Sequence, residues 1–174
     1  MKKSISLLLF GLMFISLGAL QAEPASLRQT TDLAADAAIA KRAGVPLMLI
    51  FSADNCIYCQ RLEREVLNPG IASGQFDNRV LIRYLNIDAG GKINDFDGSR
   101  IRNRLFVSRY EVFATPTVVL LNHDGEPLAA PIIGYNGAEK YQQLIEAAIT
   151  RAQNGLSPLG GPLHADNNSY YSTY

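Results

Sequence analysis

Hydrophobic side chains follow two different periods along the chain. Short apolar runs bounded by turn residues are typical of β-strands, and the first of them is apolar throughout, as in a strand buried on both faces. These runs span residues 46–51, 79–88, 117–121 and 128–133. Four other segments repeat apolar residues at helical spacing, which predicts amphipathic helices. They span residues 31–44, 56–67, 99–110 and 138–152.

Turn and capping residues mark where these elements begin and end. Thr31 and Asp32 are expected to cap the first helix, and Gly44 to stop it. The sequence Asn68-Pro69-Gly70 is expected to end the second helix. Residues 89–98 are rich in Gly and Asp and predict a loop, whereas Asn122-His123-Asp124-Gly125 predicts a hairpin turn.

The order of the elements predicts a fold class. It runs helix, strand, helix, strand, helix, strand, strand, helix, without an internal repeat. Such an order is typical of an α/β domain in which a mixed sheet is flanked by helices on both faces. The early strands are expected to be parallel, because helices connect them, and the last two to form an antiparallel hairpin. We expect this single domain to occupy residues 23–153, with residues 23–29 as a connector.

Both ends of the chain lie outside the predicted domain. Residues 1–22 resemble a secretory signal peptide, with Lys2 and Lys3, an apolar stretch from Ile5 to Leu20, and small residues before position 22. The apolar stretch is shorter than the roughly 20 residues that a membrane-spanning helix needs, although an uncleaved anchor remains the alternative. Export predicts a periplasmic location. Residues 154–174 are polar and rich in Gly, Pro and Tyr, which predicts a disordered tail.

Charge and composition exclude one class of function. Sixteen basic residues balance sixteen acidic ones, and removal of the predicted signal peptide would leave a net charge of −2. Without a basic excess the chain is not expected to bind nucleic acid.

The chemistry of the chain is expected to centre on its two cysteines, Cys56 and Cys59. A disulfide that closes so short a loop constrains the unfolded chain by only about 2 kcal/mol, so a purely structural role is a poor interpretation. Residues three apart on a helix share a face, which suits thiol-disulfide exchange. Cys56 lies in the first helical turn, where free N–H groups favour a thiolate, and is expected to be the attacking sulfur. Cys59 is expected to resolve the mixed disulfide.

Metal binding is the alternative interpretation of the same pair. A CxxC sequence also forms half of many zinc sites, but a structural zinc needs four ligands. His123 and His164 lack ligand spacing, so no metal site is predicted. Two thiolates could still hold a soft ion such as Cu(I), which would make the chain a non-catalytic binding module.

Several motifs together resemble the thioredoxin superfamily: a buried strand, a turn, CxxC at a helix start, and Thr115-Pro116-Thr117 opening a later strand. Residues around 30–152 are more narrowly similar to the periplasmic SoxW thioredoxins. The resemblance implies a thioredoxin-like fold in which Pro116 is cis and faces the cysteines, and in which the Thr115 backbone binds the substrate. It also implies a reductase of protein disulfides that needs no cofactor and receives electrons from a membrane donor of the DsbD or CcdA kind.

The chain also departs from the thioredoxin pattern. Ile50 stands where thioredoxins usually carry a buried Asp, so either proton transfer uses water or Glu111, or turnover is slower. Asn55 replaces the usual aromatic residue, and Ile57 replaces the usual Pro or Gly. Tyr58, between the cysteines, either contacts the substrate or simply tolerates solvent. These departures leave the direction of the reaction open between a reductase and an oxidase or isomerase, because direction depends on the reduction potential.

Overall fold

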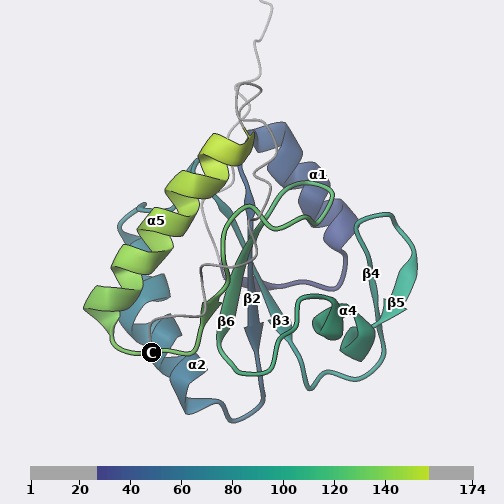
Figure 1. Ribbon diagram of the computed structural model, residues 1–174, viewed down its shortest axis with the longest axis horizontal. Coiled ribbons are helices and arrows are strands. Elements are labelled where there is room, and N and C mark those ends of the chain that lie inside the picture. The colour runs from purple at the N-terminus through teal and green to yellow at the C-terminus, as the bar shows by residue number, and fades with distance from the viewer. Residues whose placement is uncertain (1–26, 157–174) are drawn as a thin grey trace, which may run out of the picture.

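The computed structural model describes residues 27–156 and shows a five-stranded mixed sheet with helices on both faces (Figure 1). The strand order is β1-β3-β2-β6-β7. Strands β1, β3 and β2 are parallel, whereas β6 runs antiparallel to β2, and β7 antiparallel to β6. The strands are β1 (Arg28–Gln29), β2 (Leu47–Ser52), β3 (Leu81–Asn86), β6 (Thr117–Leu121) and β7 (Ile132–Ile133). The predicted fold class is therefore confirmed.

Helices cover the two faces of this sheet and enclose two hydrophobic cores. The helical elements are α1 (Leu33–Ala43), α2 (Ile57–Leu62), the π-helix η1 (Glu63–Leu67), α3 (Asn68–Ala72), α4 (Asn103–Arg109) and α5 (Ala138–Leu156). Figure 1 shows α2 and α5 on one face, and α1 and α4 on the other. Strand β2 is buried along its whole length and supplies both cores. Met48 and Ile50 face α2 and α5, whereas Leu47, Leu49 and Phe51 face α1 and α4.

Helix α1 begins and ends where the sequence predicts. The Asp32 side chain accepts a hydrogen bond from the N–H of Ala35, and Gly44 adopts a left-handed conformation at φ 67° that closes the last turn. A buried ion pair joins this helix to the sheet, since Arg83 of β3 donates to Asp36 at 2.5 Å. Asp36 also accepts from the hydroxyl of Thr30, so both carboxylate oxygens are satisfied.

Residues 89–110 differ from the prediction of a loop followed by one helix. A two-stranded antiparallel hairpin, β4 (Lys92–Asn94) and β5 (Arg100–Arg102), occupies most of this segment, and α4 begins only at Asn103. The helical spacing that includes Ile101 is misleading, because Ile101 pairs across the hairpin with Ile93. Three-residue strands are too short for a period of two to be told from a helical period.

Three further boundaries also differ from the predictions. The connector contains β1, which pairs with β3 and covers its outer edge. Helical structure does not end at Asn68-Pro69-Gly70, because Pro69 lies in the first turn of α3, where its missing N–H costs no hydrogen bond. Helix α5 extends to Leu156. The predicted signal peptide and the rest of the predicted tail lie outside the described residues.

Candidate thiol-disulfide site

Cys56 lies at the junction between strand β2 and helix α2. The chain turns through Asp54 and Asn55, and Asn55 adopts a left-handed φ of 54°, a conformation that Asn tolerates better than most residues. Cys56 then caps α2, and its Sγ accepts a hydrogen bond from the N–H of Cys59 at 3.1 Å. The two cysteines form a disulfide with their Cα atoms 5.3 Å apart. The pair therefore stands at the start of a helix, as the sequence predicts.

The two sulfur-bearing side chains differ in exposure. Cys59 is buried with 4% of its surface exposed, on the helix face that also carries Leu62 and Val66. Cys56 is only partly buried. Cys56 is thus the more exposed of the two cysteines.

Thr115 and Pro116 lie beside the cysteine pair. The Thr115 hydroxyl donates to Cys56 Sγ across 3.4 Å, and the peptide bond between Thr115 and Pro116 is cis, as the family resemblance implies. The carbonyl of Pro116 accepts from the N–H of Gly134 at 2.8 Å, and the Thr117 hydroxyl donates to the carbonyl of Ala114 at 2.7 Å. These bonds fix the loop that carries Thr115. Two donors, from Cys59 and Thr115, thus converge on the Cys56 sulfur.

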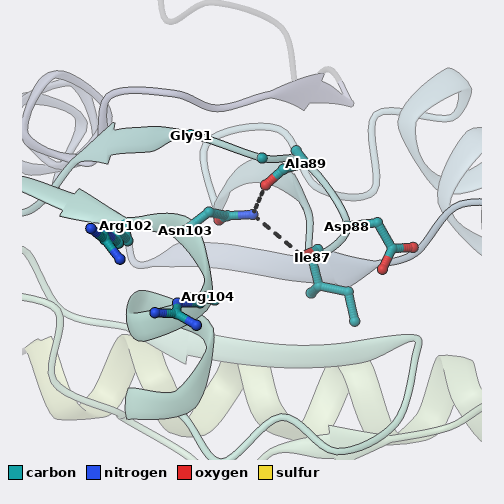
Figure 2. Close-up of a pocket in the computed structure, with 8 residues that line it drawn as sticks. Ile87, Asp88, Ala89, Gly91, Arg102, Asn103 and Arg104 are labelled. Carbon is teal, nitrogen blue, oxygen red and sulfur yellow. Dashed lines mark hydrogen bonds between the residues drawn. The ribbon is translucent and has the colours of Figure 1, made fainter.

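A hydrogen-bonded brace holds the turn that precedes Cys56. The N–H of Asp54 donates to Asp88, and Asn86 donates to the Asp54 carboxylate, both at 2.7 Å. Asn103 donates to the carbonyl of Asn86 at 2.9 Å and to that of Ala89 at 2.8 Å, which fixes the loop after β3. Figure 2 shows the bond to Ala89. The end of β3 and the start of α4 therefore both support the turn that leads to Cys56.

Exposed apolar side chains accompany the cysteine pair. Ile57 and Tyr58 lie between the cysteines with 66% and 52% of their surfaces exposed, and Phe113, two residues before Thr115, is 77% exposed. Burial of such surface is favourable when a partner covers it. The sequence analysis singled out Tyr58 but missed Phe113. The sequence did contain a signal for Phe113. It lies in the short segment between α4 and β6, where core packing does not require an aromatic residue.

Glu63 is a second residue that the sequence analysis missed. It lies one α-helical turn after Cys59, and its N–H donates to the Cys59 carbonyl, so the two side chains share a face of the helix. Partial burial raises the pKa of the Glu63 carboxyl. Ile50, by contrast, is in the apolar core, and no described hydrogen bond joins the exposed Glu111 to either cysteine.

The pKa of Glu65, a second acidic residue on this helical stretch, is shifted in the opposite direction from that of Glu63. Glu65 forms ion pairs with Arg61 and Arg64 and accepts a 2.6 Å hydrogen bond from Tyr135. These contacts, led by that of Arg61, lower the pKa of Glu65 to about 2. Burial and the bond to Glu65 raise the pKa of Tyr135 to about 12. Glu65 is therefore held as an anion near neutral pH, whereas burial shifts the pKa of Glu63 in the opposite direction.

The described part of the chain contains neither a group of side chains arranged to bind a metal nor a membrane-spanning helix. No group of three or more His, Cys, Asp or Glu side chains within residues 27–156 is arranged to hold a metal ion. Within the same range no helix is both long enough and apolar enough to cross a membrane.

The fold and the cysteine pair define a class of protein. A family model described as a thioredoxin-like domain matches residues 33–149, and the chain belongs to this family. Two curated relatives are named as thiol:disulfide interchange proteins. The chain is 28% identical over 125 residues to the thiol:disulfide interchange protein DsbD 1 of Pseudomonas aeruginosa, and 24% identical over 114 residues to DsbD of Ralstonia nicotianae. These matches cover 70% and 66% of this chain but only 20% and 17% of the relatives.

Solved structures to which the chain is similar include the oxidised C-terminal domain of DsbD from Neisseria meningitidis, at 22% identity and a TM-score of 0.48. That match covers 69% of this chain and 98% of the domain. Poplar thioredoxin h matches at 19% identity and a TM-score of 0.46, over 65% of this chain and 85% of its own. The chain is thus a thioredoxin-like protein related in sequence to DsbD, with a cysteine pair at disulfide distance.

Proposed function

We propose that this protein is a thiol:disulfide oxidoreductase that reduces disulfides of client proteins through Cys56 and Cys59. The observation that carries the proposal is the convergence of two hydrogen-bond donors on the accessible Cys56 sulfur, with Cys59 buried one turn behind it. Donors near a sulfur stabilise the thiolate, which is the nucleophilic form. A buried neighbour within bonding distance suits the resolving role.

The proposed reaction has two steps. In the reduced protein the Cys56 thiolate attacks one sulfur of the client disulfide, forms a mixed disulfide and releases the other client sulfur as a thiolate. Cys59 then loses its proton and attacks Cys56 Sγ, which reforms the Cys56–Cys59 disulfide and releases the second client thiol. Two electrons pass from the cysteine pair to the client. The proton that Cys59 loses protonates one client sulfur, and solvent returns to the other the proton that Cys56 gave up when its thiolate formed.

The surroundings of the pair suggest how a client is held. We propose that the backbone of Thr115 and the ring of Pro116 contact the client next to its target sulfur, because the Thr115 side chain already reaches Cys56. Tyr58 and Phe113 would cover apolar client side chains, since both expose large aromatic surfaces. This arrangement favours a protein segment over a small polar disulfide.

Glu63 is our candidate for the group that accepts the Cys59 proton. A general base works best when its pKa lies near the working pH, and burial raises the pKa of Glu63 in that direction. Its position one turn after Cys59 provides the proximity. Ile50 cannot take this role, so Glu63 would replace the buried Asp that thioredoxins usually carry.

Location and electron supply are further parts of the proposal. We infer a periplasmic protein close to the SoxW group, supported by the leader-like sequence of residues 1–22. The sequence relatives are DsbD proteins, which supports thiol-disulfide partners and a membrane electron donor of the DsbD or CcdA kind.

The reduction potential of the cysteine pair tests the direction of the reaction. The protein is equilibrated with dithiothreitol or glutathione buffers, and both thiols are alkylated and counted. A potential at or below roughly −220 to −260 mV, the biochemical glutathione poise of the cytosol, is expected for a reductase. A value near about −120 mV would instead assign an oxidase. Failure to form the disulfide, together with stoichiometric Cu(I) binding and no turnover, would assign a metal-binding module.

A further inference from the structure

Four basic side chains gather on the hairpin β4–β5 and the first turn of α4. They are Lys92, Arg100, Arg102 and Arg104, and all are exposed. Lys92 and Arg102 lie directly opposite each other in the hairpin register, and Arg100 is two residues from Arg102 on the same strand face. The other face of the hairpin carries Ile93 and Ile101, which pack toward the core. Like charges directly opposite each other destabilise a strand pair, so the hairpin retains an unfavourable arrangement.

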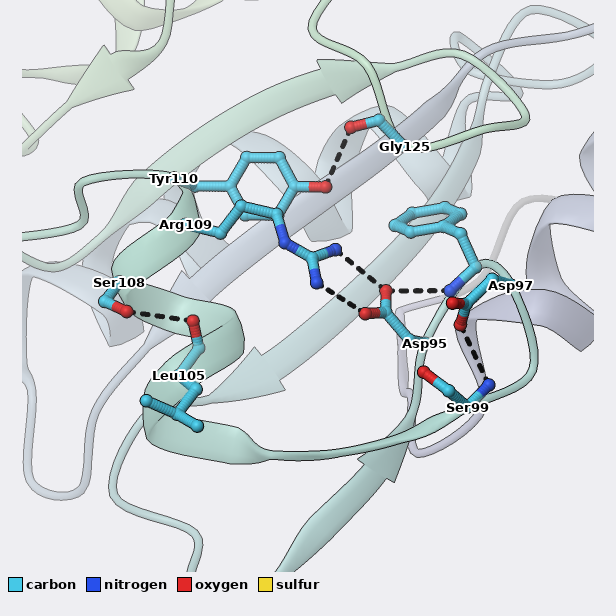
Figure 3. A network of polar contacts seen from close by, with 9 residues as sticks. Asp95, Asp97, Ser99, Leu105, Ser108, Arg109, Tyr110 and Gly125 are labelled. Carbon is cyan, nitrogen blue, oxygen red and sulfur yellow. Dashed lines mark hydrogen bonds and ion pairs between the residues drawn. The ribbon is translucent and has the colours of Figure 1, made fainter.

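The carboxylates near this basic surface are engaged elsewhere. Asp95 forms an ion pair with Arg109, and Asp97 accepts from the N–H of Ser99 (Figure 3). Asp88 accepts from the N–H of Asp54, and Asp32 from Ala35 and Asn94. Within residues 27–156, no ion pair or side-chain hydrogen bond involves Lys92, Arg100, Arg102 or Arg104. Their positive charge is therefore available to a partner.

The basic surface is structurally connected to the cysteine pair. Arg102 and Arg104 line a pocket with Gly90, Gly91 and the buried Asn103 (Figure 2). The Asn103 amide holds the carbonyls of Asn86 and Ala89, and Asn86 donates to Asp54, two residues before Cys56. A partner that docks on the hairpin would thus contact the neighbours of Asn103, which is hydrogen-bonded to the loop that supports the turn before Cys56. The pocket offers space for a side chain between the arginines and the glycine backbone.

We propose that Lys92, Arg100, Arg102 and Arg104 form an electrostatic docking surface for an acidic segment of the protein that exchanges disulfides with Cys56. This inference rests on the proposed function and adds that the protein partner carries an acidic segment. A carboxylate between Lys92 and Arg102 would relieve their repulsion, and guanidinium groups bind carboxylates in a bidentate fashion. A protein partner fits better than nucleic acid, because the chain carries equal numbers of acidic and basic residues and the basic surface is confined to one hairpin.

The test measures the exchange kinetics of the reduced full-length protein with two peptide disulfides. The peptides differ only in their flanking tracts, which are Glu in one and Gln in the other. Neutral hydroxyethyl disulfide is the third substrate. The variant Lys92→Glu/Arg102→Glu is compared with Lys140→Glu/Arg151→Glu, which makes the same charge change at exposed positions of α5.

The docking surface predicts a selective effect. The hairpin variant should lower kcat/KM for the Glu peptide by about tenfold, in the range of electrostatically steered association, and leave the Gln peptide and hydroxyethyl disulfide within about twofold. The α5 variant should behave like the unmodified protein, and added salt should weaken only the Glu-peptide reaction.

Three other outcomes are distinguishable. Equal rates for the Glu and Gln peptides, or equal losses in both variants, would overturn the docking surface while leaving the proposed function intact. Absence of turnover with all three substrates would contradict the proposed function itself. Binding of the protein to vesicles of phosphatidylcholine and phosphatidylserine, lost in the hairpin variant without a change in peptide kinetics, would assign the surface to lipid and overturn the proposal.

Discussion

The hydroxyl of Thr115 lies 3.4 Å from the sulfur of Cys56, although 59 residues separate them in the chain. The contact exists because strand β6, which begins at Thr117, pairs with β2, which ends just before the cysteine turn. The register of two strands thus brings a threonine hydroxyl to the Cys56 sulfur.

Replacement of Thr115 by Val tests the role of this hydroxyl. The variant keeps the shape of the side chain but removes a donor from the Cys56 sulfur, so the pKa of the Cys56 thiol should rise by about 0.5 to 1, the equivalent of one net hydrogen bond. The thiolate absorbance of the reduced protein, followed against pH, measures this pKa. Thr115→Ser retains the hydroxyl and should restore it. If the pKa of the Cys56 thiol is unchanged in Thr115→Val, the Thr115 hydroxyl does not stabilise the Cys56 thiolate.

The two cysteines should differ when each is replaced by Ser. Cys59→Ser retains the accessible attacking sulfur and removes the resolving one, so mixed disulfides with clients should accumulate. Cys56→Ser leaves only the buried sulfur of Cys59 and should form few mixed disulfides with clients. Non-reducing electrophoresis and mass spectrometry of the trapped adducts provide the measurement. Equal trapping by both variants would contradict the assigned roles.

Glu63→Gln tests proton transfer from Cys59. Because the pKa of Glu63 is raised by burial, its carboxylate accepts a proton more readily than an exposed Glu. The amide cannot accept it, so resolution of the mixed disulfide should slow by about tenfold or more near neutral pH. The loss should shrink at alkaline pH, where solvent removes the proton. Glu139→Gln, at an exposed position of α5, is the control. An identical pH profile in Glu63→Gln and the unmodified protein would exclude Glu63.

Phe113→Ala tests the apolar contact with the client. Removal of a side chain that is 77% exposed should leave thermal stability almost unchanged. The KM for a peptide disulfide flanked by Leu should rise by about 5- to 30-fold, because about 1 to 2 kcal/mol of apolar burial is lost, whereas hydroxyethyl disulfide should react normally. Leu105→Ala removes another exposed apolar side chain, 51% exposed, from α4 and should have no such effect. An equal rise in KM in Phe113→Ala and Leu105→Ala would show that any exposed apolar side chain has this effect, which would contradict a specific contact of Phe113 with the client.

Acid should destabilise the protein through three paired carboxylates. Arg61 lowers the pKa of Glu65 to about 2, Arg109 lowers that of Asp95, and Arg79 lowers that of Glu146. A carboxyl with a lowered folded-state pKa stabilises the fold above its unfolded pKa, and this stability is lost as the pH falls through the folded value. Urea midpoints should therefore decline from about pH 4.5 towards pH 2. Asp95→Asn should reduce stability at pH 7 by about 1 to 2 kcal/mol and make the decline shallower. A decline of unchanged slope would contradict this assignment for Asp95.

Local signals in the sequence determined much of the fold and the centre of the site. The apolar run of β2 predicted a strand buried on both faces, and Asp32 and Gly44 predicted the limits of α1. The sequence also predicted that Cys56 and Cys59 pair at the start of a helix. Both the spacing of the cysteines and the helix start can be recognised from residues that are close together in the chain. Thr115 and Pro116 were predicted only through resemblance to a family.

Only the tertiary structure brought the remaining parts together. Phe113 is exposed beside Thr115, Glu63 is partly buried behind Cys59, and Lys92 faces Arg102 across a hairpin that the sequence did not predict. Periodicity reports how residues alternate within one segment, and segments of two or three residues are too short to show it. Burial, strand register and the distance between segments depend instead on how the strands pair and the helices cross. Those relationships decided which residues surround Cys56.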